Sequence, residues 1–133
     1  MYQIIYASDE MDIDRVVNFI LASYWGKDLN RVNLIKAINN SFCAGLFLSK
    51  TQIGFARVIS DGYTSAYIRD FFVFQEFQGC GNGLRLWKAL LNHPNLSDVR
   101  RWYLGTKDSH GFYEKCGFEY SPNGIYMHLK KDD

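Results

Sequence analysis

Hydrophobic residues follow two spacings along the first 75 positions of this chain, and each spacing predicts a different kind of element. Between residues 9 and 24, apolar side chains recur every three or four positions, which predicts an amphipathic helix capped by Ser8 or Asp9. Residues 30–39 repeat this spacing and predict a second helix. Shorter runs that are almost wholly apolar predict strands, over residues 3–6, 43–49, 52–60 and 66–74.

The rest of the chain continues this succession of helices and strands. Residues 84–91 place apolar side chains on one helical face and predict a third helix. A strand over residues 102–104 and a short helix over 109–115 come next, and Gly117 ends that helix. A strand directly after Gly117 and a last strand over residues 125–129 complete the predicted order, β-α-α-β-β-β-α-β-α-β-β, which is that of an α/β (α+β) chain.

Composition and charge narrow the class of protein. Of 133 residues, 47% are hydrophobic and 17% are aromatic, so we expect one well-packed domain over residues 1–133. The 15 basic and 14 acidic residues leave a formal charge of +1, which gives no electrostatic case for binding nucleic acid or an anionic membrane. No stretch approaches the ~20 apolar residues that a membrane span needs.

The three cysteines argue against a metal site or a disulfide framework. Cys43, Cys80 and Cys116 are odd in number and show no C-x-x-C spacing. The first residues lack the basic start of a signal peptide and are soon interrupted by Asp9 and Glu10. A reducing cytoplasm is therefore the expected location.

A glycine-rich segment lies between the apolar run 66–74 and the helix predicted over 84–91. Its sequence is QGCGNG, over residues 78–83. Glycines let the backbone adopt positive φ and approach a ligand, and the free N–H groups of a first helical turn attract anions, so a phosphate site is one interpretation. A tight turn without a ligand is the other. The spacing excludes a Walker loop, which ends in Gly-Lys-Ser/Thr, and a dinucleotide fingerprint, Gly-x-Gly-x-x-Gly.

A second motif follows about twenty residues after that helix. Residues 101–118 read RWYLGTKDSHGFYEKCGF. The pattern Gln78-x-x-Gly81-x-Gly83 resembles the acyl-CoA pyrophosphate loop of the GNAT N-acetyltransferase superfamily, and FYEKCGF at 112–118 resembles its second signature. The two motifs occur in the family's order and at its separation, and residues 104–113 resemble a bacterial subgroup of small members. The resemblance covers residues 40–120, while the first 40 residues match only in pattern.

The resemblance implies a fold and a cosubstrate. The fold would be a mixed, mostly antiparallel central sheet flanked by helices, which opens to admit the pantetheine arm. The cosubstrate would be acetyl-CoA, and no metal is implied. In that family, main-chain groups hold the pantetheine arm like an added strand and polarise the thioester carbonyl. Here these groups would belong to Phe72, Val73 and Phe74.

The same resemblance assigns the glycine-rich segment. The pyrophosphate would lie on six consecutive residues, Gln78, Gly79, Cys80, Gly81, Asn82 and Gly83. Any Cβ at Gly81 would stand between the backbone and the phosphate. Many members have an asparagine seven residues before the catalytic tyrosine that helps hold the pantetheine arm. Thr106 occupies that position here and departs from the pattern, although the small bacterial subgroup tolerates threonine.

Tyr113 matches the family's tyrosine near the sulfur atom. A phenol with a pKa near 10 can donate a hydrogen bond or a proton to a departing thiolate, whose thiol has a pKa near 8.5. An aromatic side chain that only packs beside Phe112 and Phe118 is the alternative. The resemblance favours the catalytic interpretation.

The general base has two candidates. Asp70 is the first, because an acid inside an apolar run is costly to bury without a purpose. A salt bridge to Arg57 or Arg69 explains Asp70 equally well. His110 is the second candidate, and a solvated loop histidine is its alternative.

The expected activity is direct transfer of an acetyl group from acetyl-CoA to a primary amine on a small molecule or a peptide. Tyr24 and Trp25 fall in the loop that builds the acceptor site in this family, although they could instead belong to the core. A non-catalytic acyl-CoA-binding module that regulates a partner is the alternative function. The sequence does not identify the acceptor, and it leaves open a homodimer.

Overall fold

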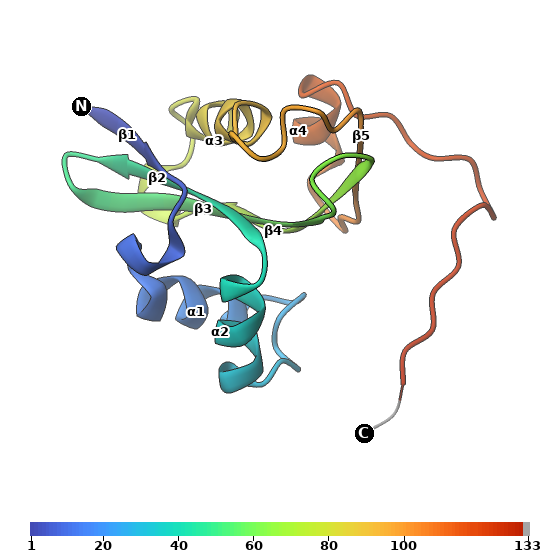
Figure 1. Cartoon of the computed structure of the whole chain (residues 1–133), viewed down its shortest axis with the longest axis horizontal. Coiled ribbons are helices and arrows are strands. Elements are labelled where there is room, and N and C mark those ends of the chain that lie inside the picture. The colour runs from blue at the N-terminus through green and yellow to red at the C-terminus, as the bar shows by residue number, and fades with distance from the viewer. Residues whose placement is uncertain (132–133) are drawn as a thin grey trace.

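The computed structural model describes residues 1–131 and arranges them around one five-stranded sheet (Figure 1). Its strands lie side by side in chain order, and the first four are antiparallel while β5 runs parallel to β4. The strands are β1 (Tyr2–Ile5), β2 (Phe42–Leu48), β3 (Thr51–Ser60), β4 (Ser65–Val73) and β5 (Arg101–Leu104).

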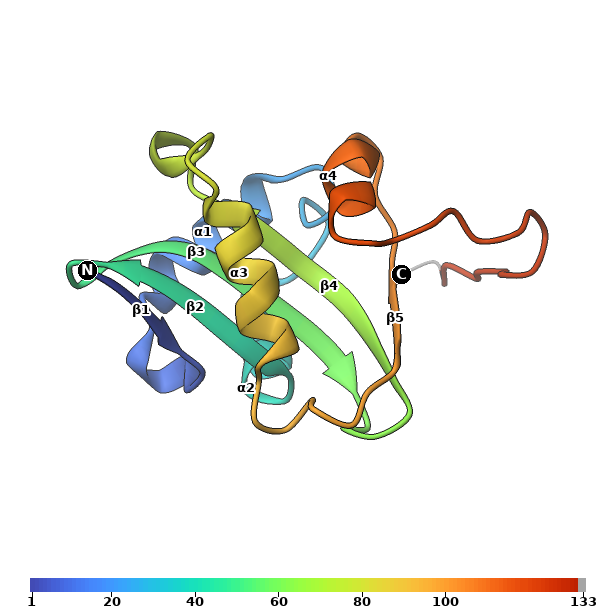
Figure 2. The ribbon, with the colours of Figure 1, turned by 90° about the horizontal axis from the view of Figure 1, so that it is seen from above.

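Helices cover both faces of this sheet. Helices α1 (Ile13–Ala22) and α2 (Arg31–Asn39) lie below it in Figure 1, and α3 (Asn82–Leu91) lies above it. Helix α4 (His110–Lys115) follows β5 on the same side as α3 (Figures 1 and 2). Because both faces are covered, β3 is buried almost without interruption from its second residue to Val58, instead of alternating.

Two hydrophobic clusters form the core, one on each face. The cluster under α3 contains Leu46, Ile53 and Val58 of the sheet and Leu86 and Leu90 of the helix. The cluster under α1 and α2 contains eleven buried residues, among them Phe55, Phe72 and Phe74. The apolar side chains of the strands therefore pack on both faces of the sheet, some against α3 and the others against α1 and α2.

The pairing of β4 with β5 is short. It runs from Ser65↔Arg101 to Ile68↔Leu104, while β4 continues to Val73 without a partner on that side. A β-bulge falls at the same point, because Arg57 pairs with Asp70 and Val58 with Ile68, which leaves Arg69 as the extra residue. Figure 2 shows the two strands moving apart toward α4. The second half of β4 therefore borders an opening in the sheet.

The order of elements predicted from the sequence is confirmed as far as α4, and the first helix needs a correction. It begins at Ile13, later than predicted, since Ser8–Glu10 form a separate turn of 3-10 helix (η1). The side chain of Asp12 caps α1 by accepting a hydrogen bond from the N–H of Arg15, at 3.4 Å. Asn30 caps α2 in the same way.

The two strands predicted after Gly117 are wrong for this structure. Residues 118–131 form no strand, and Asn123-Gly124 lies in a turn whose flanking segments do not pair. The backbone of this segment bonds locally instead, from the N–H of Ile125 to the carbonyl of Pro122 at 3.4 Å, and Pro122 has no N–H to donate to a ladder. Apolar residues predicted for the last strand are exposed instead, with Ile125 at 60% and Leu129 at 88%.

Among residues 1–131, no helix combines the length and the apolar character that crossing a bilayer requires.

The contact between α3 and the sheet generates a stability prediction. Leu86→Ala removes a fully buried side chain, so we expect the free energy of unfolding to fall by about 2–5 kcal/mol. Leu84→Ala is the matched control, because Leu84 lies on the same helix and is 40% exposed. Urea unfolding monitored by circular dichroism measures both. Equal losses in the two variants would contradict the packing described for α3.

Candidate active site

The opening between β4 and β5 exposes main-chain donors. The N–H of Phe74 donates to the carbonyl of Ile53 on β3, at 2.9 Å. Successive residues of a strand point their N–H groups to opposite sides, and the register from Asp70 to Val73 is regular, so the N–H of Phe72 also faces β3. The N–H groups of Phe71 and Val73 face the opening. The sequence predicted that main-chain groups of Phe72, Val73 and Phe74 face the opening. Among residues 1–131, Val73 is the one of these three whose N–H does so, and Phe71 is a donor that the sequence did not reveal.

The glycine-rich segment forms a turn that presents free N–H groups. Gly79 and Gly81 have positive φ values of 86° and 77°, and Gly81 is the residue before the first turn of α3. The N–H groups of Gly79, Cys80, Gly81 and Asn82 donate no hydrogen bond within the described part of the chain. Such a row of donors at a helix N-terminus suits a pyrophosphate group.

Side chains brace this turn from within. Gln78 donates through Nε2 to the carbonyl of Val73 at 2.9 Å, and buried Asn82 donates through Nδ2 to the carbonyl of Phe77 at 2.7 Å. Arg85 donates through Nη1 to the carbonyl of Cys80 at 2.8 Å and to Oδ1 of Asn82 at 3.0 Å. The side chains of Gln78 and Asn82 therefore shape the turn. Arg85 is a third brace that the sequence motif did not reveal, and the Cys80 side chain is exposed.

Gly83 has a packing role. A Cβ at this position would lie 2.8 Å from Cε1 of Phe112, closer than real side chains approach. Gly83 therefore lets α4 come close to α3. The sequence placed Gly83 in the phosphate cradle together with Gly81, but here its missing side chain makes room for the neighbouring helix.

Tyr113 lies on α4, across the opening from the free donors of β4. Its ring is packed among aromatic neighbours, 5.8 Å from the ring of Phe71 and 5.7 Å from that of Phe118. Burial raises the pKa of Tyr113 above its ordinary value, with smaller contributions from Cys116, Tyr24 and Asp108. The phenol therefore stays protonated at neutral pH and can act as a donor.

Thr106 organises the turn before α4. Its Oγ1 accepts a hydrogen bond from the N–H of Ser109, at 3.1 Å. Its hydroxyl therefore stabilises the turn that leads into α4, which carries Tyr113, and Thr106 also lines a cavity beside that tyrosine.

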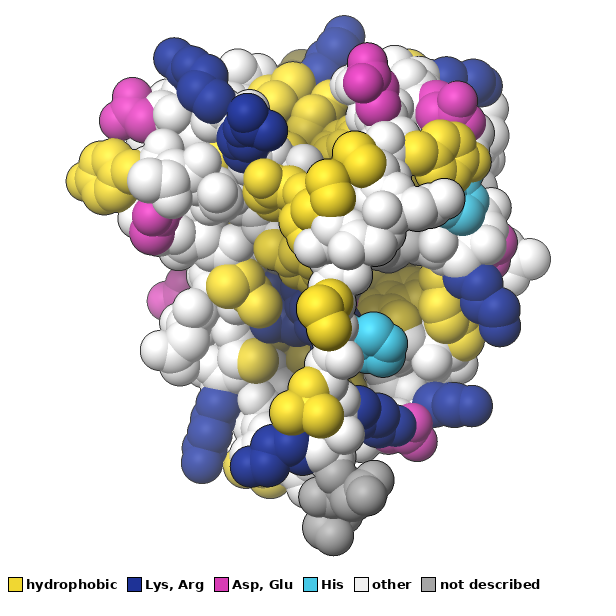
Figure 3. All heavy atoms as spheres, turned by 90° about the vertical axis from the view of Figure 1, so that its right-hand side faces the viewer, with side chains coloured by type: hydrophobic (Ala, Val, Ile, Leu, Met, Phe, Trp, Pro, Cys, Tyr) yellow, Lys and Arg dark blue, Asp and Glu magenta, His cyan; other side chains and the backbone are white. Residues whose placement is uncertain are grey.

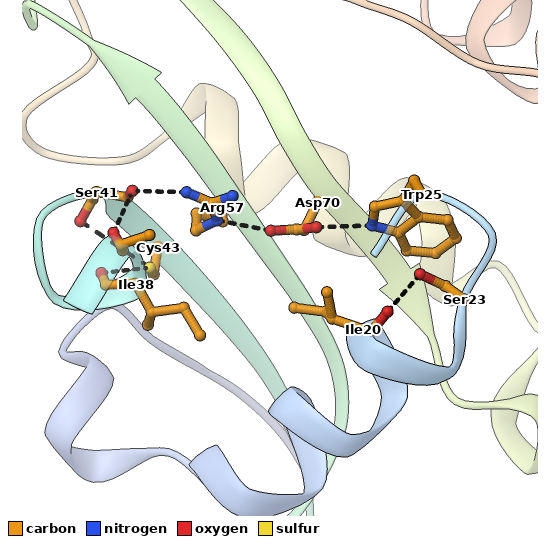
Figure 4. A network of polar contacts seen from close by, with 9 residues as sticks. Ile20, Ser23, Trp25, Ile38, Ser41, Cys43, Arg57 and Asp70 are labelled. Atoms are coloured by element: carbon orange, nitrogen blue, oxygen red, sulfur yellow. Dashed lines mark hydrogen bonds and ion pairs between the residues drawn. The ribbon is translucent and has the colours of Figure 1, made fainter. Parts of the chain in front are cut away.

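Asp70 lies in a buried network of polar contacts (Figure 4). Its Oδ2 accepts from Nε of Arg57 at 2.6 Å, and its Oδ1 accepts from Nε1 of Trp25 at 2.7 Å. Nη1 of Arg57 donates in turn to Oγ of Ser41, at 3.2 Å. The ion pair with Arg57, which the sequence left open beside the catalytic interpretation, is therefore formed. Both oxygens of Asp70 are engaged, and this geometry favours a structural role over that of a general base.

Trp25 and Tyr24 border a cavity of about 490 Å³ that opens beside Tyr113. The hydrogen bond to Asp70 fixes the indole of Trp25. The hydroxyl of Tyr24 accepts a hydrogen bond from the N–H of Lys107, at 3.1 Å, and so ties this loop to the segment after β5. The structure thus brings together the two residues predicted for the acceptor site and the predicted catalytic tyrosine.

A second cavity, of about 720 Å³, lies between β5, α4 and the segment after residue 118. Tyr113 lines both cavities, whereas His110 lines only the second and stacks on Tyr120 at 5.2 Å between ring centroids. Figure 3 faces this side of the molecule and shows a hollow floored largely by hydrophobic side chains. His110 is thus separated from the cavity that Tyr24 and Trp25 border.

Over residues 1–131, no group of three or more His, Cys, Asp or Glu side chains could hold a metal ion. Cys43, Cys80 and Cys116 are all free thiols, and burial raises the pKa of Cys43 to about 12.

Comparison with known proteins agrees with this geometry. The family model described as "Acetyltransferase (GNAT) domain" matches residues 39–120, more than half of the chain. A solved GNAT-family structure from Xanthomonas campestris pv. campestris, described as a candidate acetyltransferase, superposes with a TM-score of 0.88 and 33% identity, over 98% of this chain and 94% of that one.

Two curated proteins are also similar. A candidate acetyltransferase of Gibberella zeae, FG08082, is 29% identical over 128 residues, which cover 77% of this chain and 71% of its own. The uncharacterized N-acetyltransferase ycf52 of Gracilaria tenuistipitata var. liui is 34% identical over 95 residues, or 67% of this chain. The match spans about half, 52%, of that protein's length.

A sheet that opens beside a glycine-rich helix start, with a tyrosine across the opening, defines a domain of the acyl-transfer class. The chain belongs to the GNAT acetyltransferase family. Membership supports acyl transfer from an acyl-CoA donor to an amine acceptor as the general activity of this fold.

The buried network generates a prediction that separates the two roles of Asp70. Asp70→Asn leaves the Arg57 charge buried without its counter-ion, so we expect the free energy of unfolding to fall by about 3–5 kcal/mol. The double variant Arg57→Met/Asp70→Leu should recover most of that loss, because it removes both charges together. Chemical denaturation measures both variants. If Asp70→Asn kept full stability, the ion pair would not be the reason that Asp70 is buried.

Proposed function

We propose that this protein is an acetyl-CoA-dependent N-acetyltransferase that moves the acetyl group directly to a primary amine. The observation that carries the proposal is the set of main-chain donors without a partner in residues 1–131, at Phe71 and Val73 on β4 and in the turn at 79–82, with the protonated phenol of Tyr113 across the opening. These residues fit the long, anionic and hydrogen-bonding shape of acetyl-CoA.

Each part of the opening has a task in this proposal. The turn before α3 holds the pyrophosphate through backbone N–H groups. The N–H groups of Phe71 and Val73 bind the pantetheine arm as an added strand would, and one of them polarises the thioester carbonyl. The carbonyl of Val73 already accepts a hydrogen bond from Gln78, which holds the end of β4 in place.

The transfer step exchanges one bond for another. The neutral amine nitrogen attacks the carbonyl carbon, the new C–N bond forms, and the C–S bond breaks. The amine loses its proton to a base or to water, and the departing sulfur takes a proton that the Tyr113 hydroxyl hands on. Tyr113 regains its proton from solvent, so the thiol of coenzyme A is released and the phenol is restored. Its raised pKa keeps the phenol protonated at neutral pH, so it is available as a hydrogen-bond donor to the departing sulfur.

We assign Asp70 a positioning role in this reaction. It fixes Trp25 at the border of the cavity beside Tyr113, so it shapes the acceptor side without touching the reacting atoms. Free cysteines at exposed and half-buried positions are consistent with a reducing compartment, and we place the protein in the cytoplasm.

Binding of acetyl-CoA is tested first. A ligand at about 100 times its dissociation constant adds about 2.7 kcal/mol of stability, so acetyl-CoA should raise the melting temperature by several degrees. Gly81→Val should lose this shift, since a β-branched side chain at φ 77° distorts the turn. Gly124→Val is the control, because Gly124 has φ 78° and lies far along the chain from the turn. A full shift in Gly81→Val, or a shift with ATP or NAD in place of acetyl-CoA, would contradict the assignment.

The role of Tyr113 is tested by Tyr113→Phe, which removes the hydroxyl and keeps the packed ring. We expect kcat to fall about 10- to 1000-fold with little change in KM for acetyl-CoA, because the cofactor is held mainly by backbone groups. Because burial raises the pKa of Tyr113, loss of its proton should not lower the rate of the wild-type protein below about pH 10.

Tyr103→Phe is the matched control for this variant, since Tyr103 lines only the second cavity. Release of coenzyme A thiol is the assay. Normal acetyl-CoA binding without transfer to any amine in the wild type would favour a non-catalytic acyl-CoA-binding module. An unchanged kcat in Tyr113→Phe would show that the ring serves packing alone.

A further inference from the structure

The cavity beside Tyr113 contains charged side chains of both signs. Arg69 and Lys107 supply two positive charges, and Asp108 supplies one negative charge, among walls that are otherwise largely aromatic. The ion pairs found between residues 1 and 131 include none of these three side chains. Arg69 and Lys107 therefore line the same small space as Asp108 without an ion pair to a side chain of residues 1–131.

Arg69 owes its position to the bulge in β4. It is the extra residue between the pairs Arg57↔Asp70 and Val58↔Ile68, and a bulge turns a side chain away from the direction that a regular strand would give it. Its half-buried side chain borders the cavity at the point where β4 and β5 separate. Neighbouring Asp70 does not neutralise it, because both oxygens of Asp70 are engaged by Arg57 and Trp25.

Lys107 approaches the cavity from the segment after β5. Its N–H donates to the Tyr24 hydroxyl at 3.1 Å, and its ammonium group lies 5.5 Å from the centroid of the Tyr24 ring. This cation–π contact holds the Lys107 side chain against the loop that borders the cavity. Arg69 thus reaches the cavity from the interior of β4, and Lys107 from the segment after β5.

The charges restrict the acceptor. A primary amine with a pKa near 10.4 arrives mostly as an ammonium ion, and a cavity with two cations and one anion repels an acceptor whose only charge is positive. A volume of about 490 Å³ lies in the range of small-molecule sites, ~300–1,000 Å³. An acceptor that also carries an anionic group would match both signs of charge.

We infer that the acceptor is a small primary amine bearing a carboxylate or phosphate group, which Arg69 and Lys107 bind while Asp108 faces the ammonium group. This inference rests on the proposed acetyltransferase function and names its substrate class. Guanidinium and ammonium groups are the usual partners of carboxylate and phosphate oxygens. The aromatic walls from Tyr24 and Trp25 then contact the rest of the acceptor.

Matched acceptor sets test the inference through release of coenzyme A thiol. One set compares amino acids such as L-phenylalanine and L-leucine with their carboxamides and with their decarboxylated amines. A second set compares 2-aminoethyl phosphate with ethanolamine, and so distinguishes a phosphate from a carboxylate. We expect kcat/KM for the anionic member of at least one set to exceed that of its uncharged counterparts by 10-fold or more.

Two variants connect this preference to the cavity. Arg69→Gln and Lys107→Gln should each reduce the preference for the anionic acceptor about 10-fold through KM for the acceptor, with KM for acetyl-CoA unchanged. Arg100→Gln and Lys88→Gln are the controls, because they remove the same charges from exposed positions outside the cavity.

The outcomes separate this inference from the proposed function. If uncharged amines are acetylated as fast as the anionic ones, or if no anionic amine is acetylated, the inference is overturned while the acetyl-CoA shift still supports the family activity. An equal loss of preference in the control variants would also overturn it. Absence of both the acetyl-CoA shift and any transfer would instead remove the proposed function.

Discussion

The buried ion pair between Arg57 and Asp70 is the interaction on which the acceptor side of this molecule depends. It joins β3 to β4 directly after the bulge at Arg69, and it extends through Trp25 to the loop after α1 and through Ser41 to the start of β2. Neither ion would be tolerated alone in this place, because an unpaired buried charge carries a desolvation cost of several kcal/mol. Four segments that are distant in the sequence are therefore held in one arrangement.

Strands β4 and β5 separate beside this ion pair, at the bulge in β4. After Ile68 the two strands no longer pair, and the remainder of β4 keeps its bonds to β3 while its other edge stays open. Usually an open edge inside a sheet would be filled by the next strand. Here α3 and α4 approach each other over it, with Gly83 allowing contact with Phe112, so the opening is lined by backbone donors on one side and by Tyr113 on the other.

Local sequence patterns predicted those parts of this protein whose conformation is set by residues close together in the chain. The helix and strand periods up to residue 115 and the positive-φ glycines belong to this group, whereas the role expected of Tyr113 came from the resemblance to the GNAT family. The direction in which each main-chain N–H group of β4 points was not predicted, because it depends on the register with β3. The role of Asp70 required knowing that Arg57 lies opposite it, and the role of Gly83 required knowing where α4 packs. The sequence after Gly117 predicted two more strands, but a local pattern does not tell whether an edge of the sheet accepts a further strand.

The short pairing of β5 also has a consequence for motion. Strand β5 is joined to the sheet only by its short pairing with residues 65–68 of β4. Among the described residues, no strand pairs with its outer edge. Segments with few ladder bonds open at a lower free energy than the rest of a domain. The unit of β5 and α4, which carries Tyr113, can therefore open while the glycine turn stays fixed on α3. A ligand that contacts both the glycine turn and Tyr113 would favour the closed arrangement, so its binding should slow exchange of the amide protons in β5.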